Sequence, residues 1–452
     1  MPASGSITSE LRVLLRIGAP LMVAYIAELA MFLITRMVVG DLGYESLAAV
    51  GVSGDLTFEL LVVAMGAMSV IGVLLAQAVG AGDEKSVGHA LNQGMLVATI
   101  LGLASTAVVW CIPIALGHLG QEPVVVELAT PYLWALSGCV LPTLWFTALR
   151  SFVTAIGKTR SIMVITIGAV GVQWFFTEGL VHGKYGLPEL GVAGAGWSMT
   201  IATWMMFAAL FGHVLIAGYG KSFGWSVRAF RFDKAICRDI VRLGVPSGFL
   251  VALESGLFAA VSVLSGVIGA KALAAHQIAL SWVGLPFVIA LGLAEGAMVR
   301  VAHGIGRGDR AAARRSGIVS ITLAVVIATA LIIVPVFYGD RIVELFLSKD
   351  QRGADEVTEL ALHILIIVAV FQVFDGLQAV AARALRGLQD TVKPLWIAGF
   401  GYWIVGIGGG SIAAFHLNWG APGLWWGLAG GLIFTGACLC GRFMLLTRST
   451  GP

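Results

Sequence analysis

Long apolar runs separated by short polar segments make up almost the whole chain. Most of them reach about 20 residues or more, the length that a helix needs to cross a hydrocarbon core of about 30 Å. The runs leave no room for a separate soluble domain, so they predict an all-α integral membrane protein. We expect twelve transmembrane helices, at about residues 12–39, 48–79, 90–117, 129–156, 161–182, 190–217, 239–269, 274–303, 316–338, 357–384, 394–416 and 421–446.

The chain also contains an internal duplication. Residues 16–83 align without gaps on residues 242–309, a shift of 226 positions, the difference between 16 and 242. The identical pairs include Arg16/Arg242, Gly18/Gly244, Pro20/Pro246, Glu28/Glu254, Gly43/Gly269 and Asp83/Asp309. Apolar composition alone produces matches of Leu and Ala, but it does not align Arg, Pro, Glu and Gly together. We therefore predict two pseudo-symmetric six-helix lobes, residues 1–220 and 239–452, joined by a cytoplasmic linker at 221–238.

Composition and charge agree with a membrane location. The chain is 58% hydrophobic and 12% charged, whereas a soluble protein carries about twice that charged fraction. Twelve crossings place 22 of the 28 Lys and Arg residues on one side of the membrane. By the positive-inside rule this side is the cytoplasm, where both termini are then expected. The basic residues are divided by membrane side and form no basic face, so no nucleic-acid partner is expected.

Two acidic side chains interrupt the apolar runs at similar predicted depths. Glu254 lies twelve residues, or about 18 Å of helix, beyond Arg242, with no neighbouring cation in its run. Asp375 lies fourteen residues, or about 21 Å, inward from Ala361 at the opposite membrane face. An acid in hydrocarbon is costly unless it is protonated, paired or hydrated, so both positions indicate function.

Three segments of the second half resemble the multidrug and toxic compound extrusion (MATE) family. They are Leu253-Glu-Ser-Gly-Leu-Phe258, Leu273-Ala-Ala-His-Gln-Ile-Ala-Leu280 and Phe374-Asp-Gly-Leu-Gln-Ala-Val-Ala-Ala382. The resemblance runs over nearly the whole chain and is strongest to the bacterial NorM-like branch. It implies a secondary active antiporter of the bacterial inner membrane that exports cationic or amphipathic organic compounds in exchange for Na⁺ or H⁺. Transport would proceed by alternating access of two lobes.

The resemblance also assigns roles to individual acids. In the NorM-like branch the acids of the seventh and tenth helices form the cation site, so Glu254 and Asp375 are expected to couple transport and to hold Na⁺ or H⁺. Glu295 is a further candidate for this coupling cluster. Na⁺ needs ionised carboxylates, so protons and Na⁺ would compete for the site. A third acid, usual on the first helix, falls at Thr35, so the family's ion switch in the first lobe is not expected in its usual form.

Further polar and aromatic residues are candidates for the substrate cleft. Glu28, the repeat equivalent of Glu254, either lines the cleft and attracts cations or pairs with a partner across the halves. Glu59 and Asp55 lie four residues apart on one helical face and could extend an acidic cavity, and Arg36 is expected to pair or to snorkel. An aromatic side chain such as Trp282 could stack on an aromatic cation, but for any single aromatic residue packing or interface anchoring is the favoured interpretation. The cleft candidates are Glu28, Thr35, Glu59, Gln277, Trp282 and Tyr402.

Other classes of function are less well supported by the sequence. The alternative is a flippase or exporter of a lipid-linked sugar or another metabolite from the same superfamily, whose members often have fourteen spans and arginines lining the cavity. We find no nucleophile, metal motif or paired acid in a recognisable enzymatic context, so no enzymatic activity is expected. No cofactor is expected besides Na⁺ or H⁺ as the coupling ion. The expected partners are small organic cations and membrane lipids, with the chain acting as a monomer.

Overall fold

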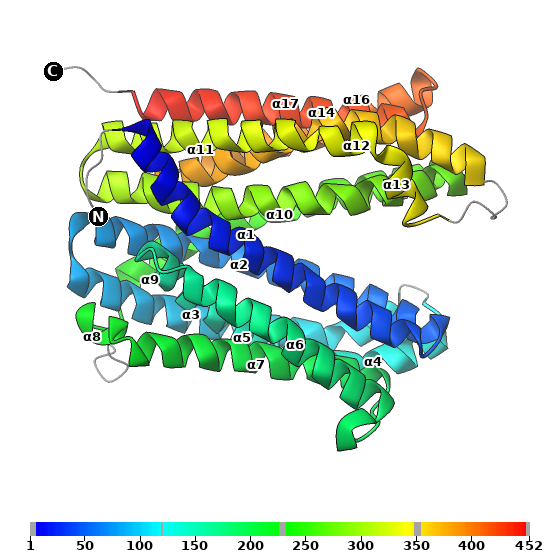
Figure 1. Ribbon diagram of the computed structural model, residues 1–452, viewed down its shortest axis with the longest axis horizontal. Coiled ribbons are helices and arrows are strands. Elements are labelled where there is room, and N and C mark those ends of the chain that lie inside the picture. The colour runs from blue at the N-terminus through cyan, green and yellow to red at the C-terminus, as the bar shows by residue number, and fades with distance from the viewer. Residues whose placement is uncertain (1–5, 119–120, 226–231, 348–353, 449–452) are drawn as a thin grey trace. The chain divides into compact units, whose positions relative to one another are not determined.

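The computed structural model describes residues 6–118, 121–225, 232–347 and 354–448, and its regular elements are helices (Figure 1). The first half contains α1 (Ile7–Gly40), α2 (Tyr44–Ala81), α3 (Glu84–His118), α4 (Pro123–Ser137), α5 (Val140–Ala155), α6 (Arg160–His182), the short 3₁₀ helix η1 (Lys184–Gly186), α7 (Val192–Ile216) and α8 (Tyr219–Ser222). The second half contains α9 (Lys234–Ile268), α10 (Ala270–Gly306), α11 (Arg310–Leu331), α12 (Ile333–Phe337), α13 (Gly339–Glu344), α14 (Ala354–Gly387), α15 (Val392–Gly399), the π-helical η3 (Phe400–Gly408) and η4 (Ile412–His416) on either side of α16 (Gly409–Ser411), and α17 (Ala421–Leu446).

The prediction of a twelve-helix membrane protein is confirmed. Within the described residues, 11 helical spans are long and apolar enough to cross a membrane, or up to 12 when the bent pair α4 and α5 counts as one span. Several helices begin before the apolar run that predicts them. For example, α3 begins at Glu84 and α11 at Arg310, six residues ahead of the predicted starts in each case. The first turns are polar because they emerge from the hydrocarbon region.

The internal duplication is visible in the way that equivalent helices begin. Asp83 accepts a hydrogen bond from the N–H of Ser86 at 3.1 Å, and Asp309 accepts one from the N–H of Ala312 at 2.8 Å. These are N-caps, which satisfy N–H groups that have no partner inside the helix. The hydroxyl and N–H of Ser86 both hold the pKa of Asp83 below its usual value. Gly43 and Gly269 both have positive φ, of 107° and 148°, at the turns before α2 and α10.

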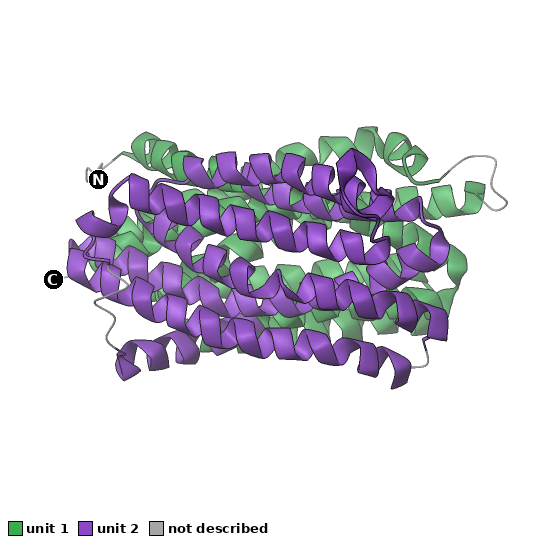
Figure 2. Ribbon diagram, turned by 90° about the horizontal axis from the view of Figure 1, so that it is seen from below, with its two compact units in different colours: residues 1–22, 249–452 green, residues 23–248 purple. Residues whose placement is uncertain are grey.

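The chain forms two compact units, coloured separately in Figure 2. One unit contains residues 23–248, and the other contains residues 1–22 together with 249–452. The units therefore differ from the predicted lobes, 1–220 and 239–452, because the beginnings of α1 and α9 each belong to the unit built mainly from the other half. The predicted linker, 221–238, includes residues 226–231, which lie outside the described part of the chain.

Glycines allow the last helices of the unit 1–22/249–452 to pack closely. A Cβ atom on Gly401 of η3 would lie 2.0 Å from Thr435 Oγ1 of α17, and a Cβ on Gly427 of α17 would lie 2.2 Å from the Cα of Gly410. No larger residue fits these positions without movement, and such small-residue contacts are typical of membrane helices. In this way η3 lies directly on α17, with Tyr402 fully buried.

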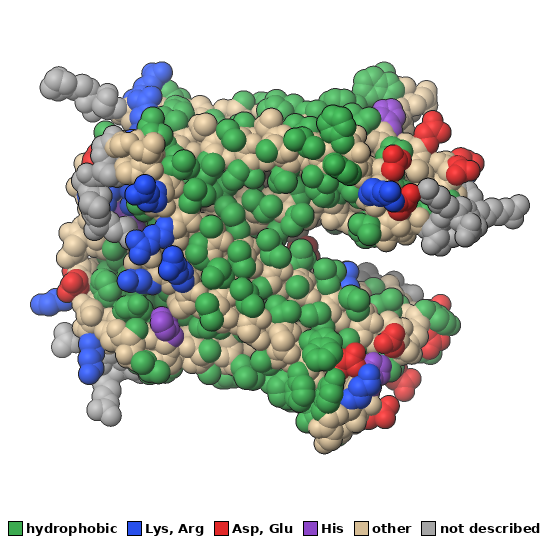
Figure 3. Space-filling view, viewed as in Figure 1, with side chains coloured by type: hydrophobic (Ala, Val, Ile, Leu, Met, Phe, Trp, Pro, Cys, Tyr) green, Lys and Arg blue, Asp and Glu red, His purple; other side chains and the backbone are tan. Residues whose placement is uncertain are grey.

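The surface of each unit divides into a hydrophobic middle and charged ends. In the face shown in Figure 3, hydrophobic side chains cover the middles of the helices, as contact with lipid requires. Lys and Arg side chains gather at the helix ends where α1 begins and α17 ends, while most Asp and Glu side chains visible there lie at the opposite ends. This is the surface of a multi-pass membrane protein.

Candidate functional site

Glu254 and Asp375 meet in one polar cluster of the unit 1–22/249–452. Glu254 comes from α9, whereas Asp375 and Gln378 come from one face of α14, three residues apart. Gln378 Nε2 donates to Glu254 Oε1 at 3.0 Å, and the Tyr402 hydroxyl donates to Gln378 Oε1 at 2.7 Å. The amide of Gln378 therefore connects the acid of α9 to the π-helical segment η3.

Asp375 is the more deeply buried acid of the cluster. Its side chain interacts with Gln378 and, electrostatically, with Glu254. Its Oδ1 atom is buried and accepts no hydrogen bond from any residue that the structure describes. A charge on one of two interacting buried carboxylates makes a charge on the other more costly, and a proton or a bound cation relieves that cost. The cluster also offers amide and hydroxyl oxygens, which are the kind of ligand that hard cations take in proteins.

A basic side chain lies next to this pair of acids. Arg383 of α14 donates to Glu295 of α10 at 3.1 Å, and both Arg383 and Arg386 interact electrostatically with Glu254. Glu254 has no neighbouring cation in its own run, but α14 supplies two in the folded chain. The predicted candidate Glu295 lies beside the cluster through its contact with Arg383. Arg300, five residues after Glu295, instead binds Glu10 through two hydrogen bonds of 2.7 and 2.8 Å.

In the unit 23–248, Thr35 belongs to a buried and electrically neutral cluster. Gln173 Nε2 donates to Thr35 Oγ1 at 3.0 Å and to Ser198 Oγ at 3.2 Å, and Thr177 Oγ1 donates to Ser198 Oγ at 2.9 Å. These side chains come from α1, α6 and α7. The prediction that Thr35 lines a cleft is corrected, because its side chain is buried among these groups. The four side chains of the cluster bring no carboxylate to the position of the usual acid.

Glu28 forms an ion pair inside the unit 23–248. Arg150 Nη1 of α5 lies 3.0 Å from Glu28 Oε1. The guanidinium carbon of Arg150 lies 5.0 Å from the centroid of the Tyr25 ring and 5.9 Å from that of Phe146. One of the two roles predicted for Glu28 was an ion pair with the other half of the chain. Glu28 does form an ion pair, but its partner lies on α5, in the same half. A quarter of the Glu28 side chain, 25%, remains exposed.

The other cleft candidates differ in exposure and in their partners. Glu59 is exposed on α2, and Asp55, one turn before it, forms an ion pair with Arg36, which is the pairing role expected for that arginine. Gln277 is exposed on α10. Trp282 Nε1 donates to Gln372 Oε1 at 3.2 Å and so has a packing role. Tyr402 is fully buried, which corrects its assignment as a surface for substrate and makes it a support for Gln378.

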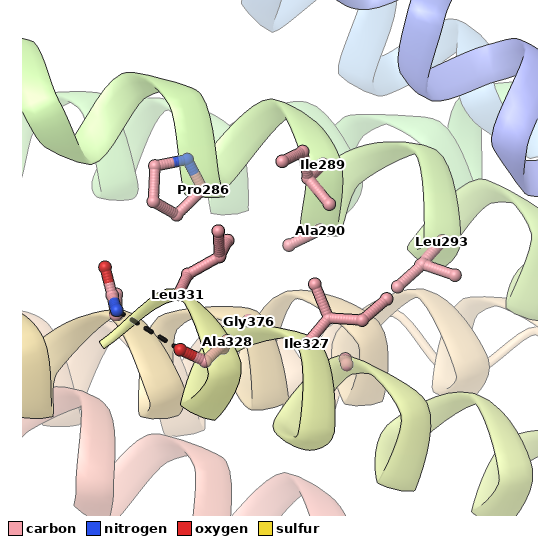
Figure 4. Close-up of a pocket in the computed structure, with 10 residues that line it drawn as sticks. Pro286, Ile289, Ala290, Leu293, Ile327, Ala328, Leu331 and Gly376 are labelled. Atoms are coloured by element: carbon pink, nitrogen blue, oxygen red, sulfur yellow. Dashed lines mark hydrogen bonds between the residues drawn. The ribbon is translucent and has the colours of Figure 1, made fainter. Parts of the chain in front are cut away.

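A small apolar cavity lies between α10, α11 and α14, and Gly376, the neighbour of Asp375, lines it (Figure 4). Gln372 Nε2 at its edge donates to the carbonyl oxygen of Ala328 at 3.2 Å. The volume, about 10 Å³, is at the lower limit for a single water molecule. The cavity is therefore too small to hold an organic cation in this conformation. It is lined by Pro286, Ile289, Ala290, Leu293, Ala324, Ile327, Ala328, Leu331, Gln372 and Gly376.

Comparison with known proteins assigns the family. The model of the MatE family matches residues 20–177 and 246–412. The chain belongs to the MatE family. The multidrug resistance protein NorM of Burkholderia vietnamiensis is 36% identical over 435 residues, which cover 96% of this chain and 94% of that protein. The probable multidrug resistance protein NorM of Deinococcus radiodurans is 34% identical over 450 residues, covering 98% and 97% of the two chains.

Solved structures show the same fold as this MatE family chain. The eukaryotic MATE transporter AtDTX14 matches with a TM-score of 0.86 and 20% sequence identity, covering 98% of this chain and 97% of the other. A MATE protein in a bent conformation matches with a TM-score of 0.88 and 18% identity, covering 97% and 95%. The predicted family and architecture are thus confirmed together.

Sequence reasoning missed the partners of the acids in this MatE family protein. Gln378 lies three residues after Asp375, a spacing that places both on one helical face and could have identified it. Gln173 and Thr177 are likewise four apart in an otherwise apolar run. Arg150 and Arg383 gave no such signal, because they lie near the ends of their runs and were counted with the cytoplasmic charges.

Proposed function

We propose that this MatE family protein is a secondary active multidrug exporter, which expels cationic or amphipathic organic compounds in exchange for Na⁺ or H⁺. The proposal is supported by relatives named as multidrug resistance proteins that match nearly the whole chain. The single observation that carries the coupling role is the buried pair of Glu254 and Asp375 joined through Gln378.

The chemistry of the pair accounts for exchange. When neither a proton nor Na⁺ is bound, the two carboxylates attract a cation. An organic cation can then supply the positive charge that the pair lacks. Entry of a proton or Na⁺ neutralises the pair and removes that attraction, because Na⁺ and H⁺ occupy the same carboxylate oxygens. Arg383 pairs directly with Glu295 at 3.1 Å and acts on Glu254 electrostatically. Among the described residues no group of three or more His, Cys, Asp or Glu side chains converges, so Na⁺ would also use neutral oxygens.

The proposed setting is the bacterial inner membrane, with both termini in the cytoplasm and the monomer as the working unit. Duplicated transporters of this layout alternate access by movement of one repeat against the other. Cargo would be released on the outer side as the ion binds, and the ion would be delivered to the cytoplasm in the return step.

The experiment is transport by purified protein in liposomes under a sodium gradient or a pH gradient imposed separately. Ethidium export should be lost in Glu254→Gln and Asp375→Asn, because each removes a charge that the coupling ion and the cargo share. The matched control is Glu356→Gln, at an exposed ion pair with Lys271 whose side chains are 67% and 54% exposed. Gradient-driven export by both cluster variants at the wild-type rate would contradict the coupling role, and the gradient that drives the wild type identifies the ion.

A further inference from the structure

The duplicated acid has a different partner in each half of the chain. Glu28 and Glu254 occupy equivalent positions of the repeat, each twelve residues, or about 18 Å of helix, beyond the equivalent residues Arg16 and Arg242. Glu254 accepts its hydrogen bond from a neutral amide, that of Gln378. Glu28 is instead bound directly by a guanidinium group, that of Arg150. The two identical acids therefore differ in their direct partner: Glu28 is bound by a guanidinium group, whereas Arg383 and Arg386 act on Glu254 only electrostatically.

Arg150 is held in place behind Glu28. Its side chain is 10% exposed, against 25% for Glu28, so the acid is the more accessible member of the pair. Tyr25, three residues before Glu28, and Phe146, four residues before Arg150, place their rings within cation–π distance of the guanidinium. Ionisable groups inside membrane helices face protein or water and not lipid. The exposed part of Glu28 thus marks a water-accessible face of α1.

Aromatic rings flank the exposed part of this face. Phe32 lies four residues after Glu28, on the same side of α1. Its ring centroid lies 4.9 Å from that of Phe58 on α2, with the two rings nearly perpendicular. An acid flanked by aromatic side chains suits an amphipathic organic cation, whose ring stacks on the aromatics. Glu28 and Arg150 together contribute a net charge close to zero to this face.

We infer that Arg150 sets the charge selectivity of this transporter by neutralising Glu28. The aromatic face around Glu28 then accepts an amphipathic monocation, and a second positive charge on the cargo gains no attraction from the neutralised pair. This inference rests on the proposed export of organic cations and adds the selectivity of that export. It concerns the residues Glu28 and Arg150 and does not depend on which ion drives transport.

The test compares ethidium with propidium, which has the same aromatic ring system and a second positive charge. Arg150→Gln leaves Glu28 unneutralised and should lower the KM for propidium relative to ethidium by about tenfold. That is the effect of one unit charge acting through about 10 Å at an effective dielectric constant of about 20. Glu28→Gln leaves Arg150 as an excess positive charge and should shift the ratio of KM values in the opposite direction.

Charge-balanced variants separate selectivity from folding. Arg150→Lys keeps the positive charge, and the double variant Glu28→Gln with Arg150→Gln is again neutral, so both should keep the wild-type ratio. Lys221→Gln, which removes an exposed positive charge from α8 of the same unit and not from the Glu28 face of α1, is the control. If Arg150→Gln does not fold, the opposite shift in Glu28→Gln and its reversal in the double variant decide the question.

Failure of the charge-selectivity inference can be distinguished from failure of the proposed function. An unchanged ratio of KM values in Arg150→Gln and Glu28→Gln, with both dyes still exported, overturns the inference and leaves the proposed function intact. Export of neither dye by the wild type contradicts the proposed function and, with it, the inference.

Discussion

Glu10 belongs to the most deeply buried ion pair in the described part of the chain. It accepts two hydrogen bonds from Arg300, of 2.7 and 2.8 Å, and a third from Ser316 at 2.8 Å. The side chains of Glu10 and Arg300 are only 3% and 5% exposed. Removing one member of such a pair leaves a buried charge without compensation, which is far more costly than losing a pair at the surface.

We therefore expect Glu10→Gln to destabilise the protein by about 3 kcal/mol, the lower end of the range for a broken buried pair, since glutamine keeps part of the hydrogen bonding. Thermal unfolding in detergent measures the change. Glu356→Gln, at the exposed pair with Lys271, makes the same chemical change and should cost at most about 1 kcal/mol. Equal melting temperatures for the two variants would contradict this assignment.

The acids themselves were predictable from sequence, whereas their partners were not. Glu254 and Asp375 interrupt apolar runs, and counting helix rise from the membrane faces predicted their similar depth. Which side chain meets an acid depends on how each helix is rotated and on which helix packs beside it. The sequence does not contain that information for Arg150 or Arg383, which reach Glu28 and Glu295 from other helices.

Between helices, the contact of α16 and η3 with α17 depends on glycine. A Cβ atom on Gly427 would lie 2.2 Å from the Cα of Gly410 and 2.5 Å from the carbonyl oxygen of Gly406. Both neighbours are backbone atoms, so no side chain can rotate to make room. Gly430, three residues further along α17, has nothing within 4 Å of such a Cβ.

Gly427→Ala should thus destabilise the protein by about 1–3 kcal/mol through overpacking. Gly430→Ala should be neutral or slightly stabilising, because alanine favours a helix over glycine. The melting temperatures of the two variants, together with ethidium export, measure the effect. A result in which Gly430→Ala is the more damaging change would refute the close contact described here.

The elements follow from sequence to different degrees. Uniform apolar runs predicted every span, because the thickness of the bilayer fixes the length of a spanning helix. The bend of 40° between α4 and α5 was not predicted. It falls at Gly138 and Cys139, inside a run that remains apolar on both sides. The π-helical geometry of η3 was also missed, although its segment is rich in glycine and packs closely on α17.

In the whole molecule, the first parts of the duplicated helices α1 and α9 are exchanged between the two compact units. The compact units change over between residues 22 and 23 in α1 and between 248 and 249 in α9, positions that are again 226 apart. A Cβ on Gly18 would lie 3.3 Å from the carbonyl oxygen of Gly292, and one on Gly244 would lie 2.6 Å from that of Ala67. These close contacts hold each beginning in the unit formed mainly by the other half. Alignment detects the repeat but cannot show with which half a helix packs.

The orientation of the whole molecule is expected from its charge distribution, and it can be tested by labelling. Single cysteines would replace Lys184 and Arg341 at one set of helix ends, and Lys221 and Arg310 at the other, in a background lacking the five natural cysteines. All four positions are exposed. The side chains of Lys184 and Arg341 are 55% and 80% exposed in their ion pairs with Glu178 and Glu344, so replacing these cations should cost little stability. Because positive residues are retained on the cytoplasmic side during insertion, a membrane-impermeant maleimide added outside spheroplasts should label the cysteines at 184 and 341. Those at 221 and 310 should react only after the membrane is opened.

Labelling of the second set in intact spheroplasts would mean the opposite orientation, and the coupling ion would then enter the acid pair from the wrong side to drive export.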